Sequence, residues 1–313
     1  MTDLSSCEGA CAPVPAPDWI AVDWGTSALR AWAMGRDGRI HARAASGAGM
    51  GSLSRAEFEP ALIALIGPWL ETAAAPVPVI ACGMVGARQG WQEAPYRSVP
   101  CAPLAGALAR IAPQDPRFTM AVVPGLCQAR PADVMRGEET QIAGFLVAEP
   151  EFDGTLCLPG THTKWVHVSA GEIVSFQTCM TGETFALLSR HSVLRHSMPG
   201  EDWDGAAFAD AVTDAMTAPQ RFSARLFALR AETLLAGLVP GAARARLSGL
   251  LIGMELAATK PYWLGRDVVI VGAPGLAPLY AAALAGAGVA ARTAASDGIT
   301  LAGLARAWQG ERR

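Results

Sequence analysis

Residues 19–27 read WIAVDWGTS, and residues 155–166 read TLCLPGTHTKWV. Each stretch begins with a short apolar run, typical of a buried strand, and opens into a turn that contains Gly and Thr. Two further apolar runs separated by a glycine reversal follow each turn, at 29–34 and 40–44 in the first copy. The chain therefore starts the same arrangement twice. This predicts an α/β protein of two lobes, each a mixed sheet flanked by helices, with a ligand cleft between the lobes.

The remaining strands and helices follow from ordinary sequence signals. Ser54, with Glu57 three residues later, is typical of a helix cap, and apolar residues at helical spacing dominate the second half of the chain. The predicted helices cover residues 54–72, 182–189, 205–217, 223–235 and 244–259, and the further strands cover residues 77–82, 119–123 and 267–271. We place the N-terminal lobe at residues 18–140 and the C-terminal lobe at residues 141–313.

Composition and charge exclude several classes of protein. With 313 residues, of which 51% are hydrophobic and 17% charged, the chain can bury the core of a soluble two-lobed protein. A net charge of -3 argues against a nucleic-acid binder. The apolar windows at 211–238 and 268–284 are interrupted before the roughly 18 to 20 apolar residues that a bilayer crossing needs, so no membrane span is predicted.

The cysteines and the N-terminus indicate a cytoplasmic protein. The seven cysteines form no CxxC pair, which fits a reducing compartment, and the histidines lack the spacing of a zinc site. Residues 1–17, MTDLSSCEGACAPVPAP, have neither the basic start nor the apolar centre of a secretory signal. We interpret them as a flexible tail. Whether the chain forms a homodimer stays open.

Both Gly-Thr turns could hold phosphate groups, although the chain has no GxxxxGK[ST] phosphate loop. Phosphoryl transfer needs a carboxylate near Mg²⁺ and hydrogen-bond donors around the phosphates, and Asp23 at the first strand end is such a carboxylate. The donors of the two turns, as candidate ATP-binding residues, are Gly25, Thr26, Ser27, Gly160, Thr161, Thr163 and Lys164. Alternatively, Asp23 caps an ordinary hairpin and Lys164 is a solvated charge.

A third glycine turn follows the predicted strand at 267–271. Its small residues would allow a planar adenine to lie against the backbone at a helix start. The candidate residues are Gly272, Ala273, Pro274 and Leu276. Taken alone, the segment is an ordinary strand-to-helix turn. The glycine segments at 47–51 and 286–288 lack the spacing of dinucleotide turns, and we interpret them as plain loops.

In this order the three turns resemble the phosphate-1, phosphate-2 and adenosine motifs of the actin-like ATPase (ribonuclease H-like) fold, which implies two lobes hinged over an ATP cleft. More narrowly, five segments are similar to those of the 2-dehydro-3-deoxygalactonokinase family of sugar kinases. They are ACGMVG at 81–86, VPGLC at 123–127, VMRGEETQ at 134–141, LPGTHTKWV at 158–166 and MTGE at 180–183.

This resemblance implies phosphorylation of 2-dehydro-3-deoxy-D-galactonate on its 6-hydroxyl by ATP, a step in galactonate catabolism. It also implies Mg²⁺ as a cofactor. Asp23 would act on the metal through water, because Mg²⁺ keeps part of its hydration shell and takes only one or two carboxylates. The sugar acid and ATP would then be the partners of the chain.

A sugar hydroxyl is a weak nucleophile, so a carboxylate must orient it and accept its proton. We predict that Glu138 is this base. The segment Arg136-Gly137-Glu138 opens a helix and resembles the place where carbohydrate kinases carry a Gly-Asp pair, although Glu replaces Asp here. Glu139 is the rival, and either acid could merely complement the positive end of its helix.

The carboxylate of a sugar acid calls for guanidinium or backbone N–H donors. Three arginines lie in or beside the motifs, and a glycine-rich turn follows the strand at 77–82. The candidate substrate-binding residues are Arg30, Met84, Val85, Gly86, Arg88, Gln89 and Arg136. The alternative interpretation of this segment is a surface turn.

Three other functions stay open at this point. A kinase for another sugar or sugar acid would share the ATP motifs, because the fold does not fix the acceptor. An actin-like nucleotide-binding regulator would bind or slowly hydrolyse ATP without a small acceptor. A sensor that only binds sugar would lack a working base, which Glu138 argues against.

Overall fold

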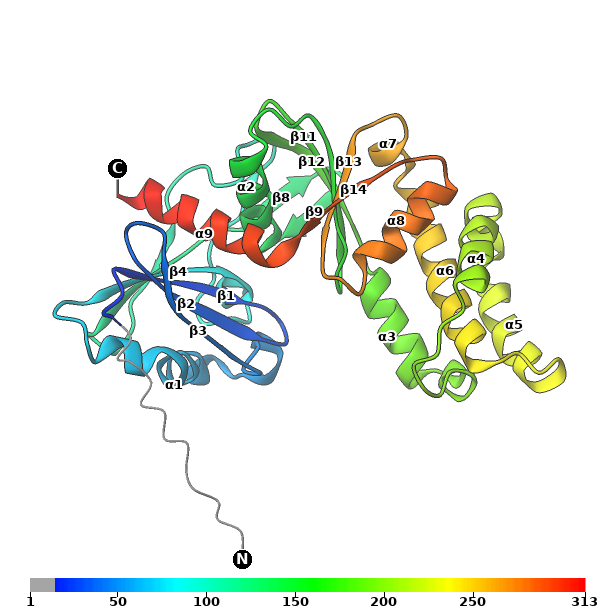
Figure 1. Ribbon diagram of the computed structural model, residues 1–313, viewed down its shortest axis with the longest axis horizontal. Helices are drawn as coiled ribbons and strands as arrows, with labels where there is room; N and C mark the ends of the chain where they lie inside the picture. Colours follow the sequence, from blue (N-terminus) through cyan, green and yellow to red (C-terminus); the bar gives the residue numbers. More distant parts are fainter. Residues whose placement is uncertain (1–14, 313) are drawn as a thin grey trace, which may run out of the picture. The chain divides into compact units, whose positions relative to one another are not determined.

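The computed structural model describes residues 15–312. The predicted N-terminal tail at 1–17 therefore lies outside the described residues except for 15–17. The chain divides into two compact units (Figure 1). Unit 1 consists of the chain up to residue 95, residues 107–124 and residues from 307 onward. Unit 2 consists of residues 96–106 and 125–306.

Unit 1 is built on one mixed sheet, which has six strands within the described residues, in the order β3-β2-β1-β4-β7-β6. Its strands are β1 (Trp19–Trp24), β2 (Leu29–Met34), β3 (Ile40–Ser46), β4 (Val77–Gly83), β6 (Ala109–Ile111) and β7 (Phe118–Val122). The first three are antiparallel, while β4 runs parallel to β1 and β7 runs parallel to β4. The predicted strand, turn, strand, hairpin and strand are confirmed.

Helix α1 (Phe58–Leu70) packs its apolar face on this sheet, where Phe58, Leu62 and Ile66 share a buried cluster with Val22. The predicted cap is present: the Ser54 side chain and the Glu57 side chain each bond the other residue's backbone N–H. The first turn is a separate short helix, η2 (Arg55–Glu57). The remaining 3₁₀ turns of this unit are η1 (Met50–Ser52) and η3 (Met84–Gly86).

Unit 2 repeats the plan of unit 1. Among the described residues its main sheet has five strands, in the order β12-β11-β10-β13-β14. They are β10 (Gly154–Leu158), β11 (Thr163–Ser169), β12 (Glu172–Cys179), β13 (Val268–Gly272) and β14 (Arg292–Ala295). The strands β10, β11 and β12 are antiparallel and β13 is parallel to β10, as β4 is to β1. The duplication predicted from the sequence is confirmed at the level of strand order.

A small sheet and a helix precede this repeat in unit 2. They are β5 (Arg97–Ser98), β8 (Leu126–Ala129), β9 (Ala132–Met135) and α2 (Glu138–Ala148). Leu126, Met135 and Ile142 share a buried cluster with Leu156 of β10. Residues 125–140 therefore fold with unit 2, whereas the sequence analysis placed the lobe boundary after residue 140. Apolar packing decides the difference, and it places Glu138 in the same unit as the second Gly-Thr turn.

The other helices follow the periodicity of the sequence closely. They are α3 (Thr181–His191), α4 (Gly205–Thr217), α5 (Phe222–Leu235), α6 (Pro240–Ala258), α7 (Lys260–Trp263), α8 (Ala277–Gly286) and α9 (Ser296–Glu311), with the 3₁₀ turns η4 (Val193–Ser197) and η5 (Pro219–Arg221). Over residues 15–312, no helix has the length and apolar character that a membrane crossing requires.

Helices α2 and α9 approach each other through glycines. A methyl group at Gly303 would lie 1.9 Å from the carbonyl oxygen of Thr140, and one at Gly144 would lie 1.9 Å from that of Ile299. Both distances are far below van der Waals contact, so only glycine allows this approach. The crossing fixes the helix that begins with Glu138.

We predict that Gly303→Ala destabilises the protein by about 1–3 kcal/mol, because the added methyl group must push backbone apart. Gly298→Ala on the same helix is the matched control, since no described atom outside its own stretch of helix lies within 4 Å of the added methyl group. It should leave stability unchanged or raise it slightly, because alanine favours a helix. Urea unfolding measures the free energy of unfolding of both variants. An equal loss of stability in the two variants would contradict the close crossing of α2 and α9.

Candidate active site

Asp23 lies at the end of β1, opposite Arg30 of β2 in the antiparallel register. Arg30 Nη2 donates to Asp23 Oδ2 over 2.5 Å, and the side chain of Asp23 keeps 17% of its surface exposed. Cys82 Sγ lies 3.8 Å from Asp23 Oδ1. The strand register thus brings the predicted metal-associated acid into contact with one of the predicted sugar-acid arginines.

The first Gly-Thr turn is supported from behind by the segment at 47–51. Gly51 N–H donates to the carbonyl of Thr26 over 2.9 Å. A methyl group at Gly49 would lie 2.3 Å from the carbonyl carbon of Ser27. This segment, interpreted from the sequence as a plain loop, therefore holds the turn in shape while Thr26 and Ser27 stay exposed.

The predicted sugar-acid turn begins at Gly83, where φ is 87° and a methyl group would lie 2.6 Å from the carbonyl oxygen of Trp24. Glycine is required there on both counts. Val85 and Gly86, which follow, are buried in unit 1. The predicted residues of this turn that are at least partly exposed are Met84, Arg88 and Gln89.

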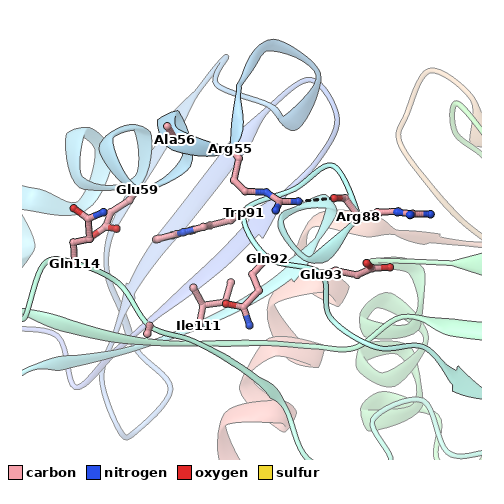
Figure 2. A pocket seen from close by; sticks show the side chains of 10 residues that line it. Arg55, Ala56, Glu59, Arg88, Trp91, Gln92, Glu93, Ile111 and Gln114 are labelled. Carbon is pink, nitrogen blue, oxygen red and sulfur yellow. Dashed lines mark hydrogen bonds between the residues drawn. The ribbon is translucent and has the colours of Figure 1, made fainter.

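A cavity of about 570 Å³ lies beside this turn (Figure 2). Its lining includes Arg55, Glu59, Arg88, Trp91, Gln92 and Gln114. Arg55 donates to the carbonyl of Arg88 over 2.8 Å, and the side chain of Arg88 points away from Trp91 in Figure 2. Sequence reasoning identified Arg88 but missed Arg55, because a charged residue in the first turn of a helix normally indicates only solvation.

In unit 2, the second Gly-Thr turn presents Lys164 to Glu138. Lys164 Nζ lies 2.9 Å from Glu138 Oε1, and it also donates to the carbonyl of His162 over 3.1 Å. The lysine side chain is 6% exposed and the glutamate side chain 22%. The lysine is therefore not a solvated charge, and the structure places the predicted phosphate cation beside the predicted base.

The structure separates the two candidate bases. Glu138 Oε2 accepts a hydrogen bond from the backbone N–H of Arg136 over 3.0 Å. Glu139 is fully buried and accepts from the N–H of Gly137 over 2.7 Å and from the hydroxyl of Thr140 over 3.1 Å. Burial, and then the negative charge of Glu138, raise the pKa of Glu139 to about 8. A carboxyl without exposed surface cannot touch a sugar, so the geometry favours Glu138.

Arg136, a predicted sugar-acid residue, is buried. Its guanidinium lies 4.4 Å from the centroid of the Tyr96 ring, within the range of a cation–π contact. Gly125 allows this arrangement, because a methyl group there would lie 2.8 Å from the Tyr96 ring. The structure therefore gives Arg136 a packing role in unit 2.

The adenosine-type turn lies against the second Gly-Thr turn. A methyl group at Gly272 would be 3.4 Å from Cδ of Pro159, which is ordinary contact. Ala273 and Pro274 are exposed and Leu276 is partly exposed. Unit 2 thus brings the predicted phosphate-2 and adenosine segments side by side, although more than 100 residues separate them in the sequence.

Thr163 faces the interior. Its hydroxyl lies 2.8 Å from that of Tyr280 on α8, and Tyr280 in turn donates to Glu255 of α6 over 2.8 Å. A contact of Thr163 with ATP would therefore involve its backbone. Sequence reasoning missed Tyr280 and Glu255, yet the signal exists: Glu255 is one acid in the otherwise apolar helical run at 249–258.

The repeated sheet, the Gly-Thr turn after the first strand of each sheet and the adenosine-type turn define an actin-like sugar kinase. A solved structure from Sinorhizobium meliloti, described as a 2-dehydro-3-deoxygalactonokinase protein, is 39% identical with a TM-score of 0.85, covering 93% of this chain and 96% of that chain. Component A of (R)-2-hydroxyglutaryl-CoA dehydratase from Acidaminococcus fermentans is only 13% identical, with a TM-score of 0.52 over 94% of this chain and 99% of that chain, and shares the fold alone.

Relatives of known name identify the particular family of sugar kinases. A probable 2-dehydro-3-deoxygalactonokinase of Rhizobium meliloti is 39% identical over 92% of this chain and 96% of its own length. The 2-dehydro-3-deoxygalactonokinase of Escherichia coli is 35% identical over 78% of this chain and 81% of its own length. The sequence model of the 2-keto-3-deoxy-galactonokinase family matches residues 23–307. The chain belongs to this family, and it is a phosphotransferase.

We predict that Glu139→Gln changes how stability depends on pH. The folded state raises the pKa of Glu139 from 4.5 to about 8, so the folded protein holds a proton that the unfolded chain releases. Wild-type stability should therefore fall as pH rises from 5 to 8, and the variant should lack this part of the loss, on the order of 1 kcal/mol or more. Urea unfolding at both pH values measures it.

Glu232→Gln is the control for this comparison. The hydrogen bond from Arg246 lowers the pKa of Glu232, so its titration lies below this pH range. The difference between Glu232→Gln and wild type should be constant from pH 5 to 8. A constant difference for Glu139→Gln as well would show that Glu139 is not buried as described.

Proposed function

We propose that the chain transfers the γ-phosphoryl group of ATP to the 6-hydroxyl of 2-dehydro-3-deoxygalactonate. The observation that carries this proposal is the 2.9 Å contact between Lys164 Nζ and Glu138 Oε1, in a chain of the 2-keto-3-deoxy-galactonokinase family. Phosphoryl transfer to a hydroxyl group requires a cation near the phosphates and a carboxylate near the hydroxyl proton. The two curated relatives are named as kinases of this sugar acid.

Glu138 is the proposed base. As the sugar hydroxyl oxygen forms its bond to the γ-phosphorus, the bond from that phosphorus to the ADP oxygen breaks, and the hydroxyl proton passes to Glu138. Lys164 would stabilise the negative charge on the phosphoryl oxygens. Because Lys164 also contacts Glu138, phosphate oxygens would compete for its ammonium group and so leave the carboxylate able to accept the proton.

The ATP contacts are proposed on the three turns. The exposed residues Thr26, Ser27 and Thr161 can offer N–H and hydroxyl donors to phosphates, and Gly25 and Gly160 let the phosphates come close to the backbone. The exposed residues Ala273 and Pro274 and the partly exposed Leu276 would take the adenosine, and the buried Gly272 would let it lie close to the backbone.

Mg²⁺ is proposed to accompany ATP. Within the described part of the chain, no group of three or more His, Cys, Asp or Glu side chains could hold a metal ion. A kinase does not need such a group, because Mg²⁺ is usually held by substrate phosphates, water and one or two carboxylates. Asp23 at the end of β1 fits that role, and the metal would neutralise charge on the phosphates.

For the carboxylate of the sugar acid, the structure favours Arg88 among the three candidate arginines. Arg30 pairs with Asp23, and Arg136 is buried against Tyr96. The Arg88 side chain is exposed, on the turn that follows β4 and beside the cavity of unit 1. A guanidinium on such a turn can bind a carboxylate through two parallel hydrogen bonds.

The experiment measures ADP formation by the purified protein with Mg²⁺ and ATP. The acceptors are 2-dehydro-3-deoxygalactonate, its gluconate-derived epimer and simple hexoses. We expect turnover with the galactonate-derived acid, and Glu138→Gln should lower kcat by about 100-fold or more because the base is lost. Glu139→Gln should keep kcat within about tenfold, since it removes no group that can touch the sugar.

Further variants assign the remaining roles. Asp23→Asn should lower kcat and raise the Mg²⁺ concentration needed for half-maximal rate, whereas Asp37→Asn in the exposed hairpin of unit 1 should do neither. Arg88→Ala should raise the KM of the sugar acid and leave that of ATP unchanged. Failure of every keto-deoxy acid to stimulate ADP formation contradicts the substrate, and a large loss confined to Glu139→Gln would contradict the assignment of the base.

A further inference from the structure

Unit 2 contains a buried carboxyl group that the proposed reaction does not use. Glu255 of α6 is 4% exposed and accepts three hydrogen bonds. Its Oε1 accepts from Trp165 Nε1 over 2.7 Å. Its Oε2 accepts from the Tyr280 hydroxyl over 2.8 Å and from the Thr181 hydroxyl. The three donors come from three different elements, β11, α8 and α3.

Each donor lies close to a segment proposed to contact ATP. Trp165 is the neighbour of Lys164. Thr181 precedes Gly182, where a methyl group would lie 2.2 Å from the carbonyl oxygen of Gly160, so the start of α3 rests on the second Gly-Thr turn. Tyr280 stands about one helical turn after Leu276 of the adenosine-type turn. The carboxyl group of Glu255 thus links residues that support two of the segments proposed to bind ATP, the second Gly-Thr turn and the adenosine-type turn.

The hydrogen bonds run in a defined direction. An indole N–H can only donate, so Oε1 must accept. When Tyr280 donates to Oε2, its oxygen is left to accept from the hydroxyl of Thr163, 2.8 Å away. The chain from Thr163 through Tyr280 to Glu255 therefore orients the first residue of β11. An ionised carboxylate satisfies all three donors, whereas a protonated carboxyl has one acceptor position fewer.

We propose that Glu255 is a positioning residue, which holds the second Gly-Thr turn and the adenosine-type turn in the arrangement that binds the nucleotide. This inference rests on the proposed function, because it assigns those turns to ATP. Glu255 would not touch the nucleotide itself. It would act through Trp165, Thr181 and Tyr280.

The test compares Glu255→Gln with wild type by calorimetric titration with Mg²⁺ and ADP, and by steady-state kinetics. The amide keeps the size of the side chain but turns one acceptor into a donor, which then faces Trp165 or the two hydroxyls. We expect the Kd of ADP and the KM of ATP to rise about tenfold, the usual effect of one buried hydrogen bond to a charged group. The KM of the sugar acid should stay within about twofold.

Two further variants complete the series. Tyr280→Phe removes one donor and keeps the carboxyl group, so the Kd of ADP should rise in the same direction but less. Tyr280→Phe also tests the proposed role of Glu255 on its own if Glu255→Gln does not fold. Glu232→Gln, the same substitution on α5, breaks the ion pair with Arg246 and should leave the Kd of ADP unchanged.

The pH dependence supplies a readout that a purely structural role would not change. Burial raises the pKa of Glu255 to about 7, against the opposing effect of its three hydrogen bonds. The titratable groups that face it are Tyr280 of α8, Cys157 of β10 and Cys179 of β12. From pH 8 to pH 6 Glu255 gains a proton, so ADP affinity should fall more in wild type than in Glu255→Gln. ADP itself also titrates in this pH range, but its effect on the affinity is the same for both proteins and cancels in the comparison.

An ADP Kd within twofold of wild type in both Glu255→Gln and Tyr280→Phe would overturn the inference, even if both melt at lower temperature. That outcome would mean that Glu255 stabilises the fold but does not position the turns for nucleotide binding. ADP binding does not depend on the sugar acid. A wild-type protein that binds ADP but phosphorylates no keto-deoxy acid therefore contradicts the proposed substrate while the role of Glu255 is still measured.

Discussion

A buried lysine needs a partner, and much of unit 2 is arranged around that requirement. Removing an ammonium group from water is costly unless a carboxylate compensates it. Lys164 satisfies this by its contact with Glu138. The start of α2 must therefore lie against β11, which Gly137 allows with a φ of 104° and which the N–H bond to buried Glu139 fixes. The glycine crossing of α2 and α9 then holds the helix in place.

The two halves of the chain support their Gly-Thr turns in the same physical way. In unit 1, Gly49 packs against the backbone of Ser27, and in unit 2, Gly182 packs against the backbone of Gly160. In both places a side chain would push the turn out of shape. A turn that presents its N–H groups outward needs such support from behind, because it has few internal contacts of its own. In each unit the packed glycine thus holds the Gly-Thr turn from one side and leaves residues on its other side exposed.

Local signals in the sequence predicted the strands and hairpins around the two Gly-Thr turns and most helices, because apolar runs, glycine reversals and the Ser54 cap act over a few residues. The short strands β5, β6, β8, β9 and β14 were not predicted. The lobe boundary was not predictable in this way, since the packing of Leu126 and Met135 on β10 decides it. The same holds for Glu255, whose donors lie 25 to 90 residues away in the chain. The choice between Glu138 and Glu139 required burial, which two adjacent acids in a sequence do not reveal.

The proposed reaction requires Glu138 and Lys164 to act together as one catalytic unit. A double-mutant cycle on kcat/KM, with Glu138→Gln, Lys164→Met and the double variant, tests it most directly. If the two side chains act as a unit, the double variant should be about as slow as the slower single variant, because the second substitution removes a function already lost. If the two losses simply multiply, the residues contribute independently and the claim is contradicted.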